Sequence, residues 1–172
     1  KGLQNNIHNK NINIVKFSQK KKCSFKNIYH PSLINNEPVK NNINLNKSII
    51  ITGPNAAGKT TILKSTIINL IFSQQVGYGF YDKGVLNPYK FIHCYINIPD
   101  SCSRDSLFQS EARRCKKILD IIDKNKNDRH FCVFDELYSG TNPYEAVSNA
   151  YGYLEYIIKN RNVNVILTTH YL

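Results

Sequence analysis

The sequence predicts an α/β fold in which helices flank a mostly parallel sheet, preceded by a small β-rich portion. After residue 46, apolar runs typical of buried strands alternate with segments of helical periodicity, as in chains that form parallel sheets. The chain has 172 residues, about the length of one domain, and 41% of them are hydrophobic. We therefore expect one domain, with 1–45 as a β-rich lead-in and 46–172 as the core. Because residue 172 closely follows a candidate functional histidine, we also expect a C-terminally truncated fragment of a longer protein.

The lead-in contains short alternating stretches such as 12–15 and 39–45, which favour strands and turns. Residues 47–52 form a continuous apolar run, which predicts a strand buried on both faces. Apolar residues then recur at helical spacing between 58 and 72, which predicts a helix packed on that strand. Gly77, Gly79, Gly84 and Pro88 indicate a loop region.

The second half of the chain repeats the alternation of strand and helix. Helical periodicity covers about 106–123, and a second helix carries Ala146, Val147, Ala150, Leu154 and Ile157, with Pro143 near its start. The predicted strands are 91–98, 130–134 and 163–167.

The most informative motif lies between the strand 47–52 and the helix that follows it. Gly53, four residues and then Gly58-Lys59-Thr60 form the P-loop pattern, in which backbone N–H groups at a helix N-terminus surround phosphates. Lys59 can reach the outer phosphates, and the Thr60 hydroxyl can ligate magnesium. The alternative is a chance match in a loop that only joins a strand to a helix. The predicted phosphate cradle consists of Gly53, Pro54, Asn55, Ala56, Ala57, Gly58, Lys59, Thr60 and Thr61.

Two carboxylates, Asp135 and Glu136, end the apolar strand 130–134. Open α/β sheets keep their sites at the carboxyl ends of their strands. Asp135 suits magnesium, and Glu136 suits the orientation of an attacking water. Taken alone, the pair would be a solvated cap or turn. Beside a P-loop, the catalytic interpretation is favoured.

His170 follows the last apolar strand after Thr168 and Thr169. A single histidine at a strand end is usually only a satisfied polar residue. As the third polar signal at a strand end of one predicted sheet, His170 is expected to donate a hydrogen bond to a γ-phosphate oxygen.

Charge and cysteine content leave the partner open but favour an intracellular protein. The formal net charge is +11, which indicates either a nucleic-acid surface or a drift of composition toward Lys and Asn. The five cysteines are scattered without paired spacing, which favours reduced thiols and a location in the cytoplasm or nucleus. The sequence shows neither a bilayer-spanning run nor a secretory signal.

The motifs together resemble the ATPase domain of the MutS mismatch-repair family, over nearly the whole chain. The P-loop, Asp135-Glu136-Leu137 followed by Gly140-Thr141, and Thr169-His170-Tyr171 carry the resemblance. Further matches are Tyr29-His30-Pro31, Val39–Leu45, the Gln75-Val76-Gly77 segment, and Ser106-Leu107-Phe108 followed by Glu111. The chain departs from the family pattern at Ala56-Ala57, Thr60, Leu107 and Tyr138-Ser139.

The resemblance implies an ABC-type ATPase fold with ATP and Mg²⁺ as cofactors. It implies a homodimer or heterodimer with nucleotides sandwiched between subunits, so that Ser106 acts on the partner's nucleotide, and it adds Gln75 to the catalytic residues. It also implies ATP hydrolysis coupled to the binding of mismatched DNA by regions outside this chain.

Other classes share parts of this pattern. A transporter nucleotide-binding domain or an SMC protein would carry a Leu-Ser-Gly-Gly-Gln signature, which this sequence lacks between the two motifs. A module that uses ATP only to lock a dimer, without hydrolysis, is the remaining alternative.

Overall fold

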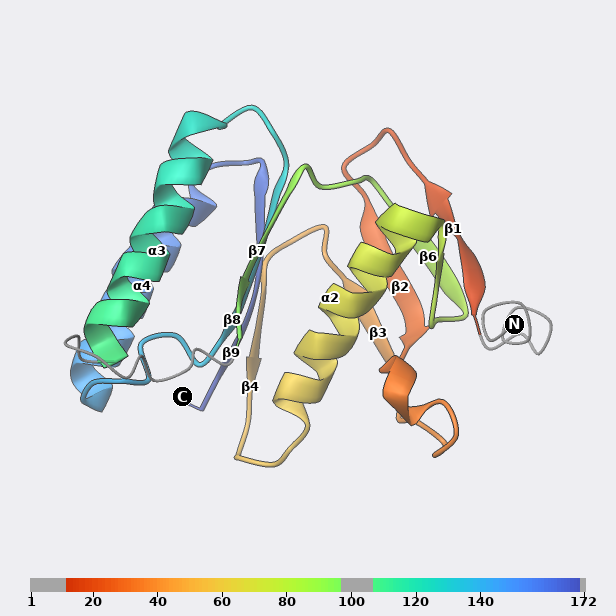
Figure 1. Cartoon of the computed structure of the whole chain (residues 1–172), viewed down its shortest axis with the longest axis horizontal. Coiled ribbons are helices and arrows are strands. Elements are labelled where there is room, and N and C mark those ends of the chain that lie inside the picture. The colour runs from red at the N-terminus through yellow and green to blue at the C-terminus, as the bar shows by residue number, and fades with distance from the viewer. Residues whose placement is uncertain (1–11, 97–106, 171–172) are drawn as a thin grey trace. The chain divides into compact units, whose positions relative to one another are not determined.

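The computed structural model describes residues 12–96 and 107–170 (Figure 1). The chain forms two compact units that alternate along the sequence. The first unit comprises Lys1–Lys47 and Gly58–Pro88, and the second comprises Ser48–Ala57 and Tyr89–Leu172. Each unit contains its own sheet.

A five-stranded sheet in the order β3-β2-β6-β1-β5 forms the first unit. Its strands are β1 (Asn13–Phe17), β2 (Cys23–Ile28), β3 (Asn41–Asn44), β5 (Tyr78–Gly79) and β6 (Lys83–Leu86). β1 runs parallel to β6, and the other pairs are antiparallel. A 3-10 helix, η1 (Pro31–Leu33), lies between β2 and β3.

Helix α2 (Lys59–Val76) packs on this sheet through Leu63, Ile67 and Leu70, all buried. Asn69 fixes the helix to the strands with polar contacts. Its Nδ2 donates to the Tyr29 carbonyl at 2.9 Å, and its Oδ1 accepts from the Phe80 amide at 2.5 Å. Fully buried, the Asn69 amide is satisfied on both sides, so these bonds fix the position of α2 on the sheet.

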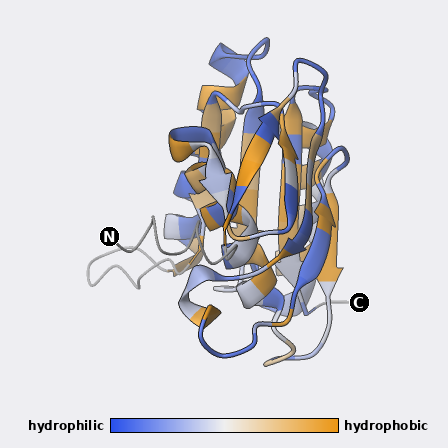
Figure 2. Cartoon of the chain, turned by 90° about the vertical axis from the view of Figure 1, so that its right-hand side faces the viewer, coloured by the Kyte–Doolittle hydropathy of each residue, from blue (hydrophilic) through white to orange (hydrophobic). Residues whose placement is uncertain are grey.

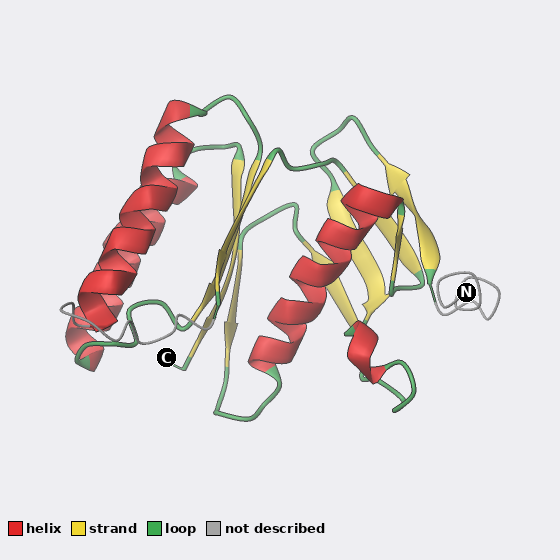
Figure 3. Ribbon diagram, in the orientation of Figure 1, coloured by secondary structure: helices red, strands yellow, loops and turns green. Residues whose placement is uncertain are grey.

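Four parallel strands in the order β4-β9-β8-β7 form the sheet of the second unit (Figure 3). They are β4 (Ile49–Thr52), β7 (Phe91–Tyr95), β8 (His130–Asp135) and β9 (Val163–Thr169). The central strand β8 is buried from His130 to Phe134, as expected for a parallel strand covered on both faces.

Helices α3 (Leu107–Lys124) and α4 (Pro143–Ile158) pack on this sheet and share its core. Asn142 caps α4: its side chain accepts from the Glu145 amide at 3.0 Å, and Pro143 occupies the first turn. The core of the second unit contains Tyr95, Cys115, Ile118, Ile122, Cys132, Phe134, Leu137, Tyr138, Ala146, Tyr153, Ile157, Val163, Val165 and Leu167.

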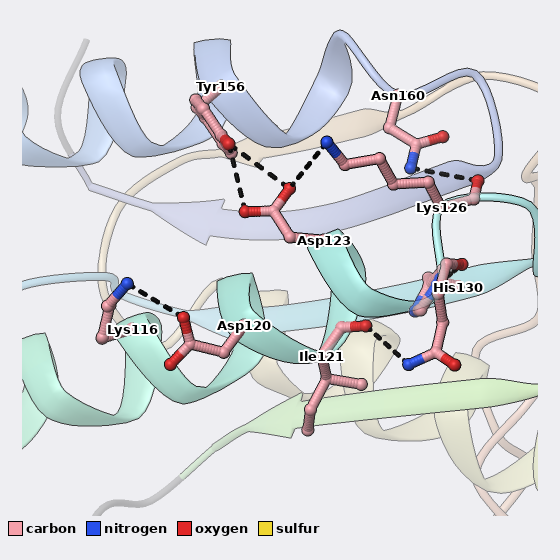
Figure 4. A network of polar contacts seen from close by, with 9 residues as sticks. Lys116, Asp120, Ile121, Asp123, Lys126, His130, Tyr156 and Asn160 are labelled. Atoms are coloured by element: carbon pink, nitrogen blue, oxygen red, sulfur yellow. Dashed lines mark hydrogen bonds and ion pairs between the residues drawn. The ribbon is translucent and has the colours of Figure 1, made fainter.

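Polar contacts join the last turn of α3 to α4 (Figure 4). The Tyr156 hydroxyl donates to the Asp123 carboxylate at 3.1 Å, and Lys126 Nζ lies 3.6 Å from the same carboxylate. Asn160 donates to the Lys126 carbonyl at 3.3 Å. These groups are exposed, so the network orients the helix ends and adds little stability.

The predicted helices and the strands of the second unit are confirmed, with boundaries shifted by a few residues. Two predictions differ from the structure. The segment after Gly77 contains β5 and β6 rather than only a loop. Gly79 and Gly84 lie within these strands because the Tyr81 ring packs against their backbone. A Cβ at either position would come within 2.7 Å of that ring.

The second difference concerns β4, for which the apolar run predicted burial on both faces. Within the described sheet β4 is an edge strand, and Ile50 is 62% exposed. The helix after β4 groups with the N-terminal strands in the first unit. None of the described helices is long and apolar enough to cross a membrane.

Candidate functional site

Three neighbouring parallel strands of the second unit end at the same level of their sheet. Thr52 on β4 is in register with Thr169 on β9, and Asp135 on β8 is in register with Thr168 on β9. The residues that follow these strands, including Glu136 and His170, therefore gather at one carboxyl edge. The structure thus brings together the three strand-end signals that the sequence predicts.

Asp135 and Glu136 are held by the neighbouring strand β9. The Thr168 hydroxyl donates a short hydrogen bond to Asp135 Oδ1, and the Glu136 amide donates to the Thr168 carbonyl at 3.1 Å. Glu136 has φ +52°, a left-handed conformation that is uncommon for a residue with a Cβ. Such conformations cluster at functional sites, where the surrounding structure maintains them.

His170 lies beside Glu136. Its Nδ1 is 3.6 Å from Glu136 Oε1, and both side chains are about 40% exposed. Each group can therefore contact a solvent-side ligand from the carboxyl edge of the sheet. This pairing places a possible hydrogen-bond donor next to a possible base.

The glycine-rich loop, residues 53–61, is continuous along the chain but divided between the units. Gly53–Ala57 continues β4 in the second unit, with Gly53 at φ +151° and Ala56 at φ +61°. Ala57 donates its amide to the Pro54 carbonyl at 3.4 Å, which closes a turn. Pro54 and Asn55 are exposed on this turn.

The rest of the glycine-rich loop forms the start of α2 in the first unit. Gly58 is the N-cap at φ +87°, a conformation that favours glycine, and no side chain among the described residues caps this helix. Lys59, Thr60 and Thr61 occupy the first turn of α2. An uncapped N-terminal turn presents its N–H groups to an anion.

Gln75 lies at the opposite end of α2. It is exposed, and 16 residues of helix separate it from Lys59, a distance of roughly 24 Å along the axis. The proposed site therefore does not include Gln75. Ser106, the other residue expected from the resemblance, lies outside the described residues.

Glu111 on α3 holds the loop that follows Glu136. Glu111 is only 2% exposed, and its carboxylate accepts hydrogen bonds from three donors. Oε1 accepts from the Ser139 amide at 3.1 Å and from the Ser139 hydroxyl at 3.2 Å, and Oε2 accepts from the Gly140 amide at 3.1 Å. Burial, and next the Glu111 carboxylate, raise the pKa of Tyr95. Because the three hydrogen bonds to Glu111 join α3 to the segment after β8, a shift of α3 would move the residues that follow Glu136.

The motifs alone give no role to Thr168 or Glu111, although each residue carries a signal. Thr168 is a fully buried hydroxyl in an apolar strand, directly after Leu167. Glu111 lies three residues after Phe108 and four before Cys115, so it occupies the buried side of α3. Charged or polar groups at buried positions need partners, which makes both residues candidates for positioning roles.

The residues present fit a magnesium ion held mainly by phosphates. Among the residues that the structure describes, no three His, Cys, Asp or Glu side chains gather into a metal site. Mg²⁺ in nucleotide sites takes only one or two protein ligands, together with phosphates and waters. The orientation of the Asp135 carboxylate by Thr168 suits such a ligand.

Comparison with known protein families matches residues 49–172 to MutS domain V. The chain belongs to the MutS family. Domain V is the ATPase domain of this family. The match covers all of the second unit that the structure describes from Ile49 onward, together with α2.

Relatives carry two different names. A DNA mismatch repair protein MutS from Persephonella marina is 31% identical over 149 residues, covering 83% of this chain and 17% of the relative. An Endonuclease MutS2 from Streptococcus uberis is 32% identical over 166 residues, covering 95% of this chain and 21% of the relative. Another Endonuclease MutS2, from Staphylococcus haemolyticus, is 33% identical over 150 residues, covering 84% of the chain and 18% of the relative. The chain thus spans about a fifth of the length of the relatives it matches.

Proposed function

We propose that this chain binds and hydrolyses ATP as the ATPase domain of a MutS-like DNA mismatch-repair protein. The observation that carries the proposal is the level carboxyl edge of β4, β9 and β8, where Glu136 and His170 lie 3.6 Å apart. At this edge β4 ends and the chain continues into the glycine-rich loop. The match to domain V supports the same activity.

Each residue of the proposed site has one task. The backbone of the glycine-rich loop and Lys59 hold the triphosphate, which the uncapped start of α2 favours. Thr60 and Asp135 would hold Mg²⁺, which neutralises phosphate charge when bound. Glu136 orients the attacking water and accepts its proton, and His170 donates a hydrogen bond to a γ-phosphate oxygen. Thr168 keeps the Asp135 carboxylate in place.

The proposal extends to an assembly, by the family resemblance. Two ATPase domains, identical or related, would share each nucleotide, with Ser106 of one subunit acting on the nucleotide of the other. Hydrolysis would be coupled to the binding of mismatched DNA by regions outside this chain.

Nucleotide binding by the whole chain tests the cradle. Lys59→Ala should weaken the binding of a fluorescent ATP analogue by about 10- to 100-fold, because a charged hydrogen bond to phosphate contributes about 1.5–3 kcal/mol. Lys64→Ala, five residues further along α2, is the matched control and should bind as the wild type does. Unchanged affinity in Lys59→Ala would reject the cradle.

Turnover tests the catalytic pair. In the native full-length protein, Glu136→Gln should leave nucleotide affinity within a few-fold and lower phosphate release by at least about 100-fold, the usual contribution of a general base. Equal turnover in the variant and the wild type would remove Glu136 from the mechanism. ATP-dependent dimerisation without phosphate release in the wild type would instead identify a non-hydrolysing module.

A further inference from the structure

Net positive charge is concentrated in the first unit, because acidic residues are scarce there. The sequence of the first unit holds 12 basic residues and two acidic ones, whereas the second unit holds 11 and 10. All 12 basic residues of the first unit are lysines, whereas the second unit has six lysines and five arginines, so a drift toward lysine shared by the whole chain does not explain the difference. The asymmetry therefore needs a cause specific to the first unit.

Three lysines of this unit, Lys16, Lys26 and Lys83, share one face of its sheet, and we call them the lysine face. Lys26 on β2 is directly opposite Lys83 on β6. Lys16 on β1 pairs with Val85, which lies two residues from Lys83 and so points to the same side. Since adjacent strands lie about 5 Å apart and residues two positions apart on a strand lie about 7 Å apart, the backbone positions of the three lysines fall within roughly 12 Å of one another.

This face is the one that α2 does not cover. The alternate residues of the same strands, Val15, Phe25, Gly84 and Leu86, point toward the helix and are buried, whereas all three lysines are exposed. Along the strands in Figure 2, hydrophobic and hydrophilic segments alternate in keeping with this pattern. The sheet therefore presents the three lysines opposite its core, with exposed Ile14 beside Lys16.

Few acidic groups balance the lysine face. Glu37 and Asp82 are the only acidic residues in the sequence of this unit, and Asp82 lies 3.5 Å from Lys40 Nζ. Further exposed lysines extend the charge at Lys20, Lys21, Lys22 and Lys47. Like charges directly opposite each other on a sheet destabilise it, so an anionic partner would relieve the repulsion between Lys26 and Lys83.

We propose that the lysine face binds the phosphate backbone of duplex DNA. Exposed Asn42 and Asn44 add amide donors at its border, and such groups contact phosphates without reading sequence. Tyr78, in register with exposed Ile14, places one aromatic ring at the β5 edge of this face, whereas sequence-independent single-strand binding stacks successive bases on several aromatic rings. The choice of DNA among polyanions rests on the proposed function, whereas the preference of the face for a polyanion rests on its charge alone.

Binding of a fluorescent 30-base-pair duplex to the whole chain, without nucleotide and over a series of salt concentrations, tests the proposal. The triple variant Lys16→Gln, Lys26→Gln, Lys83→Gln should bind at least about 10-fold more weakly at 100 mM salt, and its slope of log K against log salt should fall by about 2 to 3. The control variant Lys117→Gln, Lys124→Gln, Lys159→Gln removes equal charge from the second unit and should bind as the wild type does. Equal weakening in both variants would overturn the assignment of the face.

Lys83→Glu separates binding from folding. It converts the like-charged pair with Lys26 into an oppositely charged one, so its melting temperature should match or exceed that of the wild type while DNA binding weakens. Wild-type DNA affinity in this variant would overturn the proposal.

Other occupants are distinguished by parallel measurements. Lysine-dependent binding that is tighter to a single strand of the same length, or to phosphatidylserine vesicles, would reject duplex DNA as the partner. Lys59→Ala should keep its DNA affinity, so failure of the ATP site would leave this result intact. Loss of DNA binding in Lys59→Ala would assign the DNA to the glycine-rich loop instead and overturn the lysine face.

Discussion

His93 and His130 form a buried pair on the adjacent strands β7 and β8. Their rings stack at 5.4 Å, and His93 Nε2 lies 3.1 Å from His130 Nδ1. His130 Nε2 faces the Asn125 carbonyl at 3.0 Å, and a carbonyl can only accept. His130 therefore carries its proton on Nε2, and its Nδ1 accepts from the N–H of His93. In this chain of bonds His93 donates to His130, which in turn donates to the Asn125 carbonyl.

Acid should destabilise the protein through His93. Burial, and next the repulsion from His130, lower the pKa of His93 to about 4 from its ordinary value near 6.5. Between about pH 6.5 and pH 4, His93 is protonated in the unfolded chain but neutral in the folded one. The free energy of unfolding therefore falls as the pH drops through this range. The loss should reach about 3 kcal/mol, measured by urea unfolding across this range.

His93→Gln supplies the comparison for this pH dependence. Glutamine keeps an N–H donor for His130 and does not titrate, so the variant should lose less stability over the same pH range. An unchanged pH dependence in His93→Gln would refute the assignment.

At the scale of elements, Gly140 sets how closely α3 approaches the loop after β8. A Cβ at this position would lie 2.7 Å from Leu107 Cγ and 2.9 Å from the Phe108 backbone nitrogen. The backbone contact cannot be relieved by a rotamer change. The start of α3 and the loop after Glu136 are thus in direct contact at Gly140, in addition to the Glu111 bonds.

Two glycine substitutions should have opposite effects on the free energy of unfolding. Gly140→Ala should destabilise the chain by about 1–3 kcal/mol, because the added methyl group overpacks this contact. Gly152→Ala, within α4 and with no atom within 4 Å of the added Cβ, should stabilise by about 0.5–1 kcal/mol. Chemical denaturation of both variants measures the difference, and equal shifts would contradict the predicted close approach.

The sequence is most informative about elements whose periodicity and caps agree. Helix α4 begins with Asn142 and Pro143 and keeps an apolar stripe, so its place is predictable. Strands β5 and β6 are not predictable in this way, because Gly79 and Gly84 indicate a loop until the Tyr81 ring is seen against them. Their glycines serve packing between segments, which local sequence does not reveal.

The same distinction holds for the candidate site. Asp135, Glu136 and His170 can be predicted because each directly follows an apolar strand. The support from Thr168 and Glu111 depends on register and on contacts across 33 and 28 positions of sequence, so it could not be read from spacing. The exposed edge of β4 likewise depends on strand order, which an apolar run leaves open.

At the scale of the whole molecule, the uneven charge should make stability depend on salt. The first unit has 12 basic residues against two acidic ones, so its folded form repels itself. Sodium chloride shortens the screening length from about 10 Å at 0.1 M to about 3 Å at 1 M. We expect the melting temperature to rise by about 2–4 °C over this range, a shift that corresponds to about 1 kcal/mol.

The two triple lysine variants identify the source of the salt effect. Circular dichroism melts should show a smaller rise in the variant of the lysine face than in the wild type. The variant of the second unit should keep the wild-type rise. The same salt response in both variants would place the repulsion elsewhere.

The pairing of β4 with β9 has a consequence for synthesis of the chain. Among the described residues β4 pairs only with β9, and Ile49 meets Ile166. A ribosome adds roughly 5–20 residues per second, so these apolar residues wait roughly 6–25 seconds for their partner strand. During that interval the nascent chain carries an unpaired β-edge whose Ile49, Ile50 and Ile51 are available to chaperones or to other chains. Translation pauses between α4 and β9 should therefore influence the yield of folded protein.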